Sequence, residues 1–203
     1  KTGCAVARVQ AVAHGWQLLG DDGAVLAEAD AVVLANARDA LNLAPGQTWP
    51  LNTVRGQITQ LPPGSLPHIR RVIAREGYVA PGAGQLLVGA TYEHDDDDAT
   101  PRAASDRANL ARLEAILPGA GAHLAADAVS GRASLRATLP DRLPIVGVVA
   151  GQPGLVVAAG YASRGVVWAG LLGEALADRM TGQPVPLEAD LMQAIAPERF
   201  TRQ

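Results

Sequence analysis

The segment from Gly160 to Gly165 has the residue types and the spacing of a ligand-binding turn. The apolar run Leu155–Ala159 before it predicts a strand, and the segment after it predicts a helix that begins near Arg164. This order directs free backbone N–H groups and the positive end of a helix dipole at the end of the strand. Because glycine lacks a Cβ atom, a flat ligand can approach the backbone closely there. The alternative is a tight strand-to-helix connection whose glycines serve packing.

The histidines, Ser163 and the cysteine do not have the spacing of a metal site or of a catalytic nucleophile. The four histidines are scattered without the spacing of metal ligands, so no metal site is predicted. Ser163 lacks the Gly-x-Ser-x-Gly setting of a serine nucleophile. Cys4 is the single cysteine, which excludes a disulfide framework and a cysteine metal site. The histidines are His14, His68, His94 and His123.

The charge balance gives the chain no general attraction to nucleic acid or to an anionic membrane. The formal net charge is −3 over 203 residues. Arg70, Arg71 and Arg75 form the one basic cluster in the middle of the chain, which could contact an RNA backbone or be ordinary surface charge. No apolar run has the length of a membrane span and no signal peptide is present, so we expect a cytoplasmic protein without membrane contact.

The elements that must position the turn begin with a predicted antiparallel meander. Its strands are Ala5–Val12, Trp16–Leu19 and Ala24–Ala27, separated by Gly- and Asp-containing turns. Ala31–Ala35 is apolar throughout, which predicts a strand buried on both faces, as in a parallel sheet covered by helices.

The middle of the chain predicts an antiparallel sheet and one helix. Leucines repeat at helical spacing over Ser105–Leu117, and Ser105 is the expected N-cap. The acidic run Glu93–Asp98 is expected to be a solvated loop. The predicted strands are Val54–Leu61, Val72–Ile73, Tyr78–Ala80, Gln85–Val88 and Ala126–Leu135.

These elements predict an α+β (mixed α/β) fold. Three of them, in this order, resemble the D-amino-acid-oxidase-type family of FAD-dependent oxidoreductases: the meander with Ala31–Ala37, the block from Ser134 to Gly147, and the turn Gly160–Gly165 with its helix. The resemblance implies a partial FAD-binding domain in residues 1–50 and 141–203. It also implies an antiparallel-sheet substrate domain in residues 51–140.

The resemblance implies FAD as the cofactor and names the residues that would contact it. The helix after the turn would direct its amides and its dipole at the carbonyl edge of the flavin. The position after Asn36, often glycine in the family, is alanine here. The expected cofactor-binding residues are Val9, Ala35, Asn36, Ala37, Gly160, Tyr161, Ala162, Ser163, Arg164, Gly165 and Val166.

Three residues are candidates for the substrate site that the resemblance implies. Arg136 would bind a substrate carboxylate through two parallel hydrogen bonds, and the alternative is a surface or interdomain salt bridge. Tyr78 would line the pocket or bind the same carboxylate, or else is a half-buried strand tyrosine. Arg55 would lie near the isoalloxazine, or else is an ordinary structural arginine.

A narrower resemblance is to the oxidase half of bifunctional enzymes that make 5-methylaminomethyl-2-thiouridine in tRNA. It rests on Val54–Gln57, Gly77-Tyr78, the Gly160–Gly165 turn and the segment from Pro186 to Phe200. It implies oxidation of the carboxymethylaminomethyl group of wobble uridine, with release of glyoxylate, and an upstream methyltransferase domain. The alternatives are a glycine- or sarcosine-type oxidase of free amino acids, and a non-catalytic chain unable to hold flavin.

One departure from the family concerns the cofactor. No Gly-x-Gly-x-x-Gly motif follows a strand anywhere in this chain, so the cradle for the FAD pyrophosphate is missing from it. The chain also opens on Lys1 without a methionine, so we expect a fragment whose dinucleotide-binding motif lies upstream.

Overall fold

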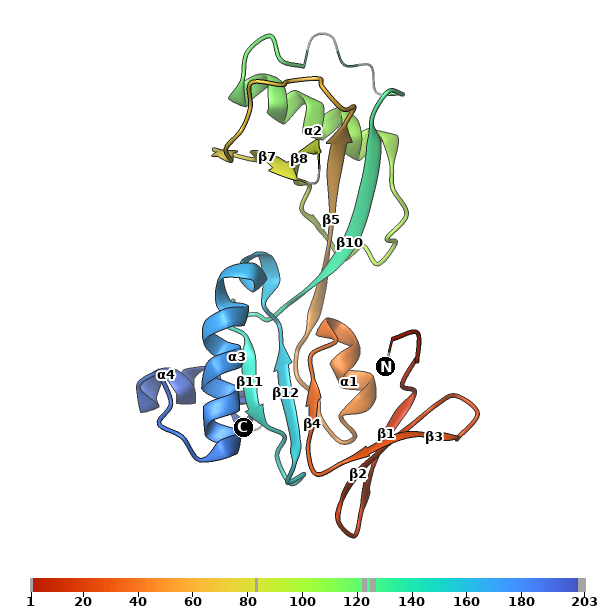
Figure 1. Ribbon diagram of the computed structural model, residues 1–203, viewed down its shortest axis with the longest axis vertical. Helices are drawn as coiled ribbons and strands as arrows, with labels where there is room; N and C mark the ends of the chain where they lie inside the picture. Colours follow the sequence, from red (N-terminus) through yellow and green to blue (C-terminus); the bar gives the residue numbers. More distant parts are fainter. Residues whose placement is uncertain (1, 83, 122–123, 125–126, 201–203) are drawn as a thin grey trace. The chain divides into compact units, whose positions relative to one another are not determined.

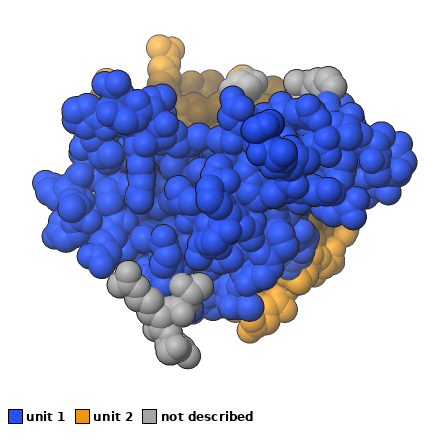
Figure 2. Space-filling view, turned by 90° about the horizontal axis from the view of Figure 1, so that it is seen from below, with its two compact units in different colours: residues 1–52, 136–203 blue, residues 53–135 orange. Residues whose placement is uncertain are grey.

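The computed structural model describes residues 2–82, 84–121, 124 and 127–200, which form a mixed α/β fold with antiparallel sheets (Figure 1). His123 and the predicted strand start at Ala126 lie outside these residues. The chain divides into two compact units, unit 1 with residues 1–52 and 136–203 and unit 2 with residues 53–135 (Figure 2). The domain roles given above to residues 1–50, 51–140 and 141–203 stay predictions.

Unit 1 begins with the expected meander. Its strands are β1 (Arg8–Val12), β2 (Gly15–Leu19) and β3 (Val25–Ala29), paired in that order and antiparallel. The first strand begins at Arg8 instead of Ala5. Buried Trp16 donates its indole N–H to the carbonyl oxygen of Pro153 at 3.0 Å, which ties the meander to the loop before strand β12.

A second sheet in unit 1 carries the predicted turn. Its strand order is β11 (Ile145–Val148), β12 (Leu155–Ala159) and β4 (Val32–Leu34). Strand β12 is antiparallel to β11 and parallel to β4, so the parallel pairing expected from the apolar run is confirmed.

Both faces of the central strand of this sheet are covered. On one face Leu155 and Val157 pack in a core with Trp16 and Trp49, next to α1 (Ala40–Leu43). On the other face Val156 packs against α3 (Gly165–Thr181) and α4 (Ala189–Ala194), as Figure 1 shows.

The expectation that Ala31–Ala35 is buried on both faces is wrong for Val33 and for Ala35, which is exposed where β4 ends. Val33 is 43% exposed, whereas Val32 and Leu34 are buried. The physical reason is that Val33 lies on the α3 side of the edge strand β4, and the core on that side draws its strand residues from β11 and β12 alone.

Unit 2 is a sheet covered by one helix. The strands are β5 (Asn52–Leu61), β6 (Ile73–Ala74), β7 (Tyr78–Gly82), β8 (Gln85–Gly89), β9 (Glu93–His94) and β10 (Ser130–Thr138). Their order is β10-β5-β8-β7-β6, and β9 pairs with β5. Val79 and Val88 pack under Leu113 of α2 (Ala103–Ile116), whose leucine stripe is confirmed. The helix begins at Ala103, so Arg102 and not Ser105 is its N-cap.

Candidate functional site

Two turns leave the same edge of the sheet in unit 1. Strands β4 and β12 run in the same direction, with Leu34 opposite Val157, so Ala35–Ala37 and Gly160–Ala162 both follow carboxyl ends of parallel strands. Ligands of α/β sheets commonly bind at such an edge. The structure therefore brings together the two groups of residues that the sequence predicts as cofactor-binding.

Each of these turns holds an alanine in the left-handed region. Ala37 has φ 56° and Ala162 has φ 51°. This conformation costs a residue with a Cβ atom about 1–2 kcal/mol, and such residues are concentrated at functional sites. At Ala37 the sequence offers a signal, because glycine is frequent at this position in the family it resembles. At Ala162 the residue type offers none.

The two glycines that bound the second turn differ in the space that surrounds them. Gly160 has φ +75°, and a Cβ atom there would lie 2.6 Å from Cδ1 of Leu139. Glycine is therefore required here for packing, because Leu139 and Leu51 fill the space beside it, and its expected contact with the cofactor stays a prediction. A Cβ atom at Gly165 would make an ordinary 3.4 Å contact with Tyr161.

Helix α3 begins with an open first turn. It follows the 3-10 turn Ala162–Arg164, no side chain caps it, and its first turn contains no acidic residue. Val166 and Val167 at its start are 98% and 78% exposed. Arg164 lies over the ring of Trp168, with its Cζ atom 5.2 Å from the ring centroid. Amide donors beside exposed apolar side chains suit a flat aromatic ligand with an electronegative edge.

The remaining predicted cofactor residues are placed differently. Ala35 and Asn36 are exposed at the edge of β4. Tyr161 is half-buried, and burial raises the pKa of its hydroxyl. Val9 is 5% exposed in the core, opposite Leu18 in the meander, so the structure does not place it in either turn.

Tyr78 lies on the face of its sheet that α2 leaves uncovered. Its register partner on β8 is Gly89, and the Tyr78 hydroxyl oxygen lies 2.9 Å from the position of a Cβ atom there. Gly89 in turn pairs with Ile58 of β5. Neighbouring Val79 faces α2, and side chains alternate along a strand, so Tyr78 faces away from the helix.

Arg55 lies on the opposite face, inside a polar network. It is fully buried and donates to the carbonyl oxygens of Asp98 and Thr100, both at 2.7 Å. It also donates to the side chains of Glu93 at 2.6 Å and Gln57 at 2.9 Å, and more weakly to that of Ser105 at 3.2 Å. These engaged donors favour the structural alternative for Arg55, and its expected place near the isoalloxazine stays a prediction.

The network extends under α2. Asp106 accepts hydrogen bonds from Gln57 Nε2 at 2.8 Å and from the Thr59 hydroxyl at 2.6 Å. Asn109 donates to the Thr59 hydroxyl at 3.0 Å. Sequence reasoning missed these buried polar residues, because their partners are about fifty positions away.

The expectation of a purely solvated acidic loop is wrong for three of its residues. Burial raises the pKa of the Glu93 carboxyl, but the hydrogen bond and the charge of Arg55 outweigh it, so this pKa is lowered. Arg102 pairs with Asp96 and with Asp98, at 2.9 Å for the latter, and hydrogen bonds lower the pKa of both aspartates. The ion pairs arise because β9 and the start of α2 meet beside Arg55.

Arg136 lies near the end of β10, in the part of the strand that belongs to unit 1, and is half-buried. It takes part in interactions with other groups of the protein.

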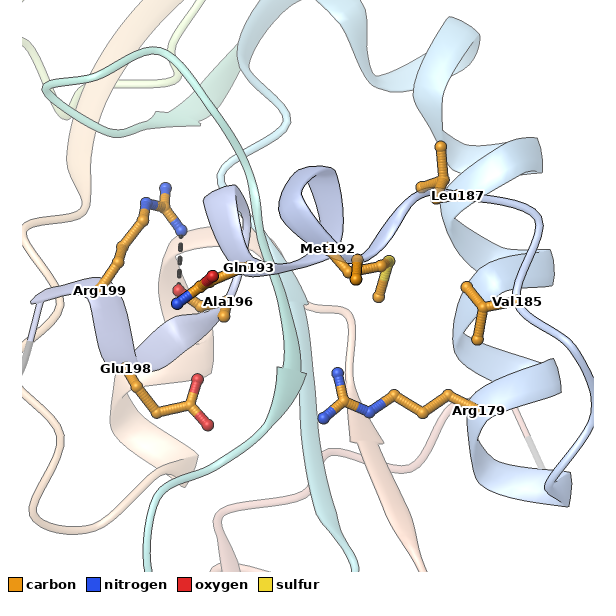
Figure 3. Close-up of a pocket in the computed structure, with 9 residues that line it drawn as sticks. Arg179, Val185, Leu187, Met192, Gln193, Ala196, Glu198 and Arg199 are labelled. Carbon is orange, nitrogen blue, oxygen red and sulfur yellow. Dashed lines mark hydrogen bonds between the residues drawn. The ribbon is translucent and has the colours of Figure 1, made fainter.

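A hollow of about 790 Å³ lies between α3 and the segment that contains α4 (Figure 3). Arg179, Met192 and Glu198 line it, with Arg199, which donates to Asp141 at 2.7 Å. Arg179 is fourteen residues after the start of α3, which places it about 20 Å from the open first turn. This hollow is therefore separate from the candidate site.

Two further findings concern the part of the chain that the structure describes. It contains no group of three or more His, Cys, Asp or Glu side chains that could hold a metal ion. None of its helices is both long enough and apolar enough to cross a membrane.

Comparison with known proteins relates this geometry to flavoenzymes. The family described as FAD dependent oxidoreductase matches residues 1–179. The tRNA 5-methylaminomethyl-2-thiouridine biosynthesis bifunctional protein of Thiobacillus denitrificans is 74% identical over 98% of this chain and 33% of its own length. The protein of the same name from Burkholderia mallei is 43% identical over 98% of this chain and 34% of its own. The chain thus spans about a third of these relatives.

Solved structures share the fold. Glycine oxidase from Geobacillus kaustophilus superposes with a TM-score of 0.78 at 23% identity, over 93% of this chain and 50% of that one. Iminodiacetate oxidase from Chelativorans sp. BNC1 superposes with a TM-score of 0.76 at 23% identity, over 94% and 52%. At this identity the likeness concerns the fold alone.

Proposed function

Because this chain belongs to the FAD-dependent oxidoreductases of the D-amino-acid-oxidase type, we propose that it serves the oxidative step of a tRNA modification. The proposed substrate is the carboxymethylaminomethyl group of wobble uridine. Loss of two hydrogens across its glycine C–N bond and addition of water to the resulting C=N bond leave the aminomethyl base and release glyoxylate. FAD, the cofactor of this family, accepts the two electrons when bound.

The observation that carries the proposal is the edge where β4 and β12 end. The open first turn of α3 offers amides and a positive dipole end, exposed Val166 offers an apolar contact, and no acid in that turn opposes an electron-rich ring edge. These residues fit the ring system of FAD. The Gly-x-Gly-x-x-Gly motif that binds the pyrophosphate in dinucleotide-binding folds is not present in the sequence given.

Two residues are proposed to contact the substrate. Arg136 binds the substrate carboxylate through two charge-assisted hydrogen bonds, which would fix the orientation of the carbon to be oxidised. Tyr78 contacts the substrate from the open face of its sheet, which the burial and register of β7 and β8 support. The relative from Thiobacillus denitrificans favours the tRNA substrate over a free amino acid, because its printed name concerns tRNA and it is 74% identical.

The test uses a hybrid in which this chain replaces the matching third of the Thiobacillus denitrificans protein. We expect the hybrid to retain a visible flavin band after gel filtration and to oxidise carboxymethylaminomethyl-tRNA. Arg136→Met should raise KM for this tRNA by about 10- to 100-fold, as loss of a bidentate ion pair predicts. A hybrid that holds flavin and oxidises glycine or sarcosine but not the tRNA would instead favour the amino-acid oxidase.

A further inference from the structure

The edge of the sheet in unit 2 that ends at β6 carries a group of arginines. Arg70 and Arg71 come just before β6, and Arg75 comes just after it. All three are exposed, and β6 is the last strand at this edge. Within residues 66–77 the single acidic side chain is Glu76.

A fourth arginine reaches this edge from α2. The backbone N–H of Arg75 donates to the carbonyl oxygen of Gly77 at 2.8 Å, which closes the turn between β6 and β7. The Cδ atom of Arg112 lies 3.1 Å from the position of a Cβ atom at Gly77. The same Cβ atom would lie 2.7 Å from the carbonyl oxygen of Gly89, so glycine at this position lets both the neighbouring strand and Arg112 approach the turn. We call Arg70, Arg71, Arg75 and Arg112 the β6 arginine patch.

The charges of this patch are not neutralised within the described part of the chain. Among the described residues none of its four arginines forms an ion pair, and Arg112 donates one hydrogen bond, to the Asn109 side chain at 3.1 Å. By contrast Arg55, Arg102 and Arg199 are paired with carboxylates. The patch is thus a local positive field on a chain whose formal net charge is −3.

We propose that the β6 arginine patch binds the phosphate backbone of RNA and so holds the tRNA on unit 2. The inference rests on the proposed function. Its chemistry is charge complementarity: exposed arginines on both sides of the edge strand β6 match a chain of phosphates, and release of counterions drives their association. Such contacts position the RNA without reading its bases.

The test measures binding of unmodified tRNA to this chain by fluorescence anisotropy at several salt concentrations. The triple variant R70S/R71S/R75S removes three phosphate contacts. It should lower the slope of log affinity against log salt by about 2 and weaken binding at 0.1 M salt about 100-fold. The lysine variant R70K/R71K/R75K keeps the charges and should restore most of the binding.

The matched control is R8S/R107S/R179S, which removes the same charge from three other exposed arginines. It should keep the wild-type slope to within about 0.5, since it leaves the patch intact. An equal loss of tRNA affinity in both triple variants would mean that net charge alone drives binding, and it would overturn the proposed role of the patch.

A second measurement needs no variant. Bound tRNA should protect Arg70, Arg71 and Arg75 from an arginine-specific dicarbonyl reagent more strongly than Arg8 and Arg107. The wild-type chain could bind tRNA with the same affinity as the serine variant and with equal protection of all these arginines. In that case the proposed role of the patch is wrong and the proposed function stands. If the wild-type chain binds phosphatidylserine vesicles but no tRNA, the proposed role of the patch is overturned, and the proposed function is decided separately by tRNA oxidation in the hybrid.

Discussion

Replacing Arg55 tests whether this arginine serves the fold or the chemistry. In R55M the methionine fills part of the space but donates none of the five hydrogen bonds that Arg55 makes to Glu93, Gln57, Ser105 and two backbone carbonyls. Removing one partner of a buried ion pair costs about 3–5 kcal/mol. Glu93 is 32% exposed and can regain water, so we expect the lower part of that range, about 3 kcal/mol.

The assay must report on unit 2 alone. Trp16, Trp49 and Trp168 all lie in unit 1, so tryptophan fluorescence does not follow the unit that contains Arg55. Hydrogen exchange of residues 103–116 does, because α2 closes over the network. A loss of 3 kcal/mol speeds exchange there by about 150-fold.

The control for R55M is R75M, at an exposed arginine. It should change the free energy of opening of α2, measured by hydrogen exchange, by less than about 0.5 kcal/mol. The reasoning is refuted if R55M leaves the protection of α2 equal to that of R75M. In that case, a loss of oxidation by R55M in the hybrid would make Arg55 a functional residue after all.

Three further predictions follow from the site and the network. A37G and A162G should each raise the free energy of unfolding of unit 1 in urea by about 0.5–1 kcal/mol, because glycine adopts the left-handed conformation without strain. The control A40G in α1 should lower it by about 1 kcal/mol, and destabilisation by A37G would contradict the reasoning. V166D should weaken FAD binding by the hybrid about tenfold, since a carboxylate would replace an apolar contact at the start of α3, while protein stability stays unchanged or rises slightly. An unchanged FAD affinity in a titration would argue against this site. The pKa of Glu93 is lowered below its ordinary 4.5, so its ion pair stabilises unit 2 above that pH, and the stabilisation is lost as pH falls through the lowered value. Hydrogen exchange should therefore show E93Q to be less stable than wild type at pH 7 and equally stable at strongly acidic pH. A difference that stays constant across pH would refute the linkage.

Much of the fold is predictable from the sequence, because its signals are local. The strands of the meander are bounded by Gly15 and by the turn at Gly23, both at positive φ, and α2 shows its leucine stripe. The turn into α3 is readable for the same reason, since an apolar strand and small residues identify it without knowledge of distant contacts.

What sequence reasoning missed depends on distant neighbours. Ser105 looks like an N-cap, but its hydroxyl is engaged with Arg55 and Glu93, which approach from β5 and β9. Val33 looks like a core residue, because hydropathy does not tell which strands a helix will cover. For the same reason the sequence does not show that Arg55 has partners up to fifty positions away, which hold it in a buried polar network.

The most direct test of the proposed function is the yield of glyoxylate from the hybrid. Flavin-loaded hybrid would be incubated with tRNA that carries carboxymethylaminomethyl uridine at the wobble position, and both glyoxylate and the modified base would be quantified by mass spectrometry. The proposed reaction predicts one glyoxylate for each base converted to the aminomethyl form. A hybrid that retains its flavin band but leaves the base unchanged and forms no glyoxylate would contradict it.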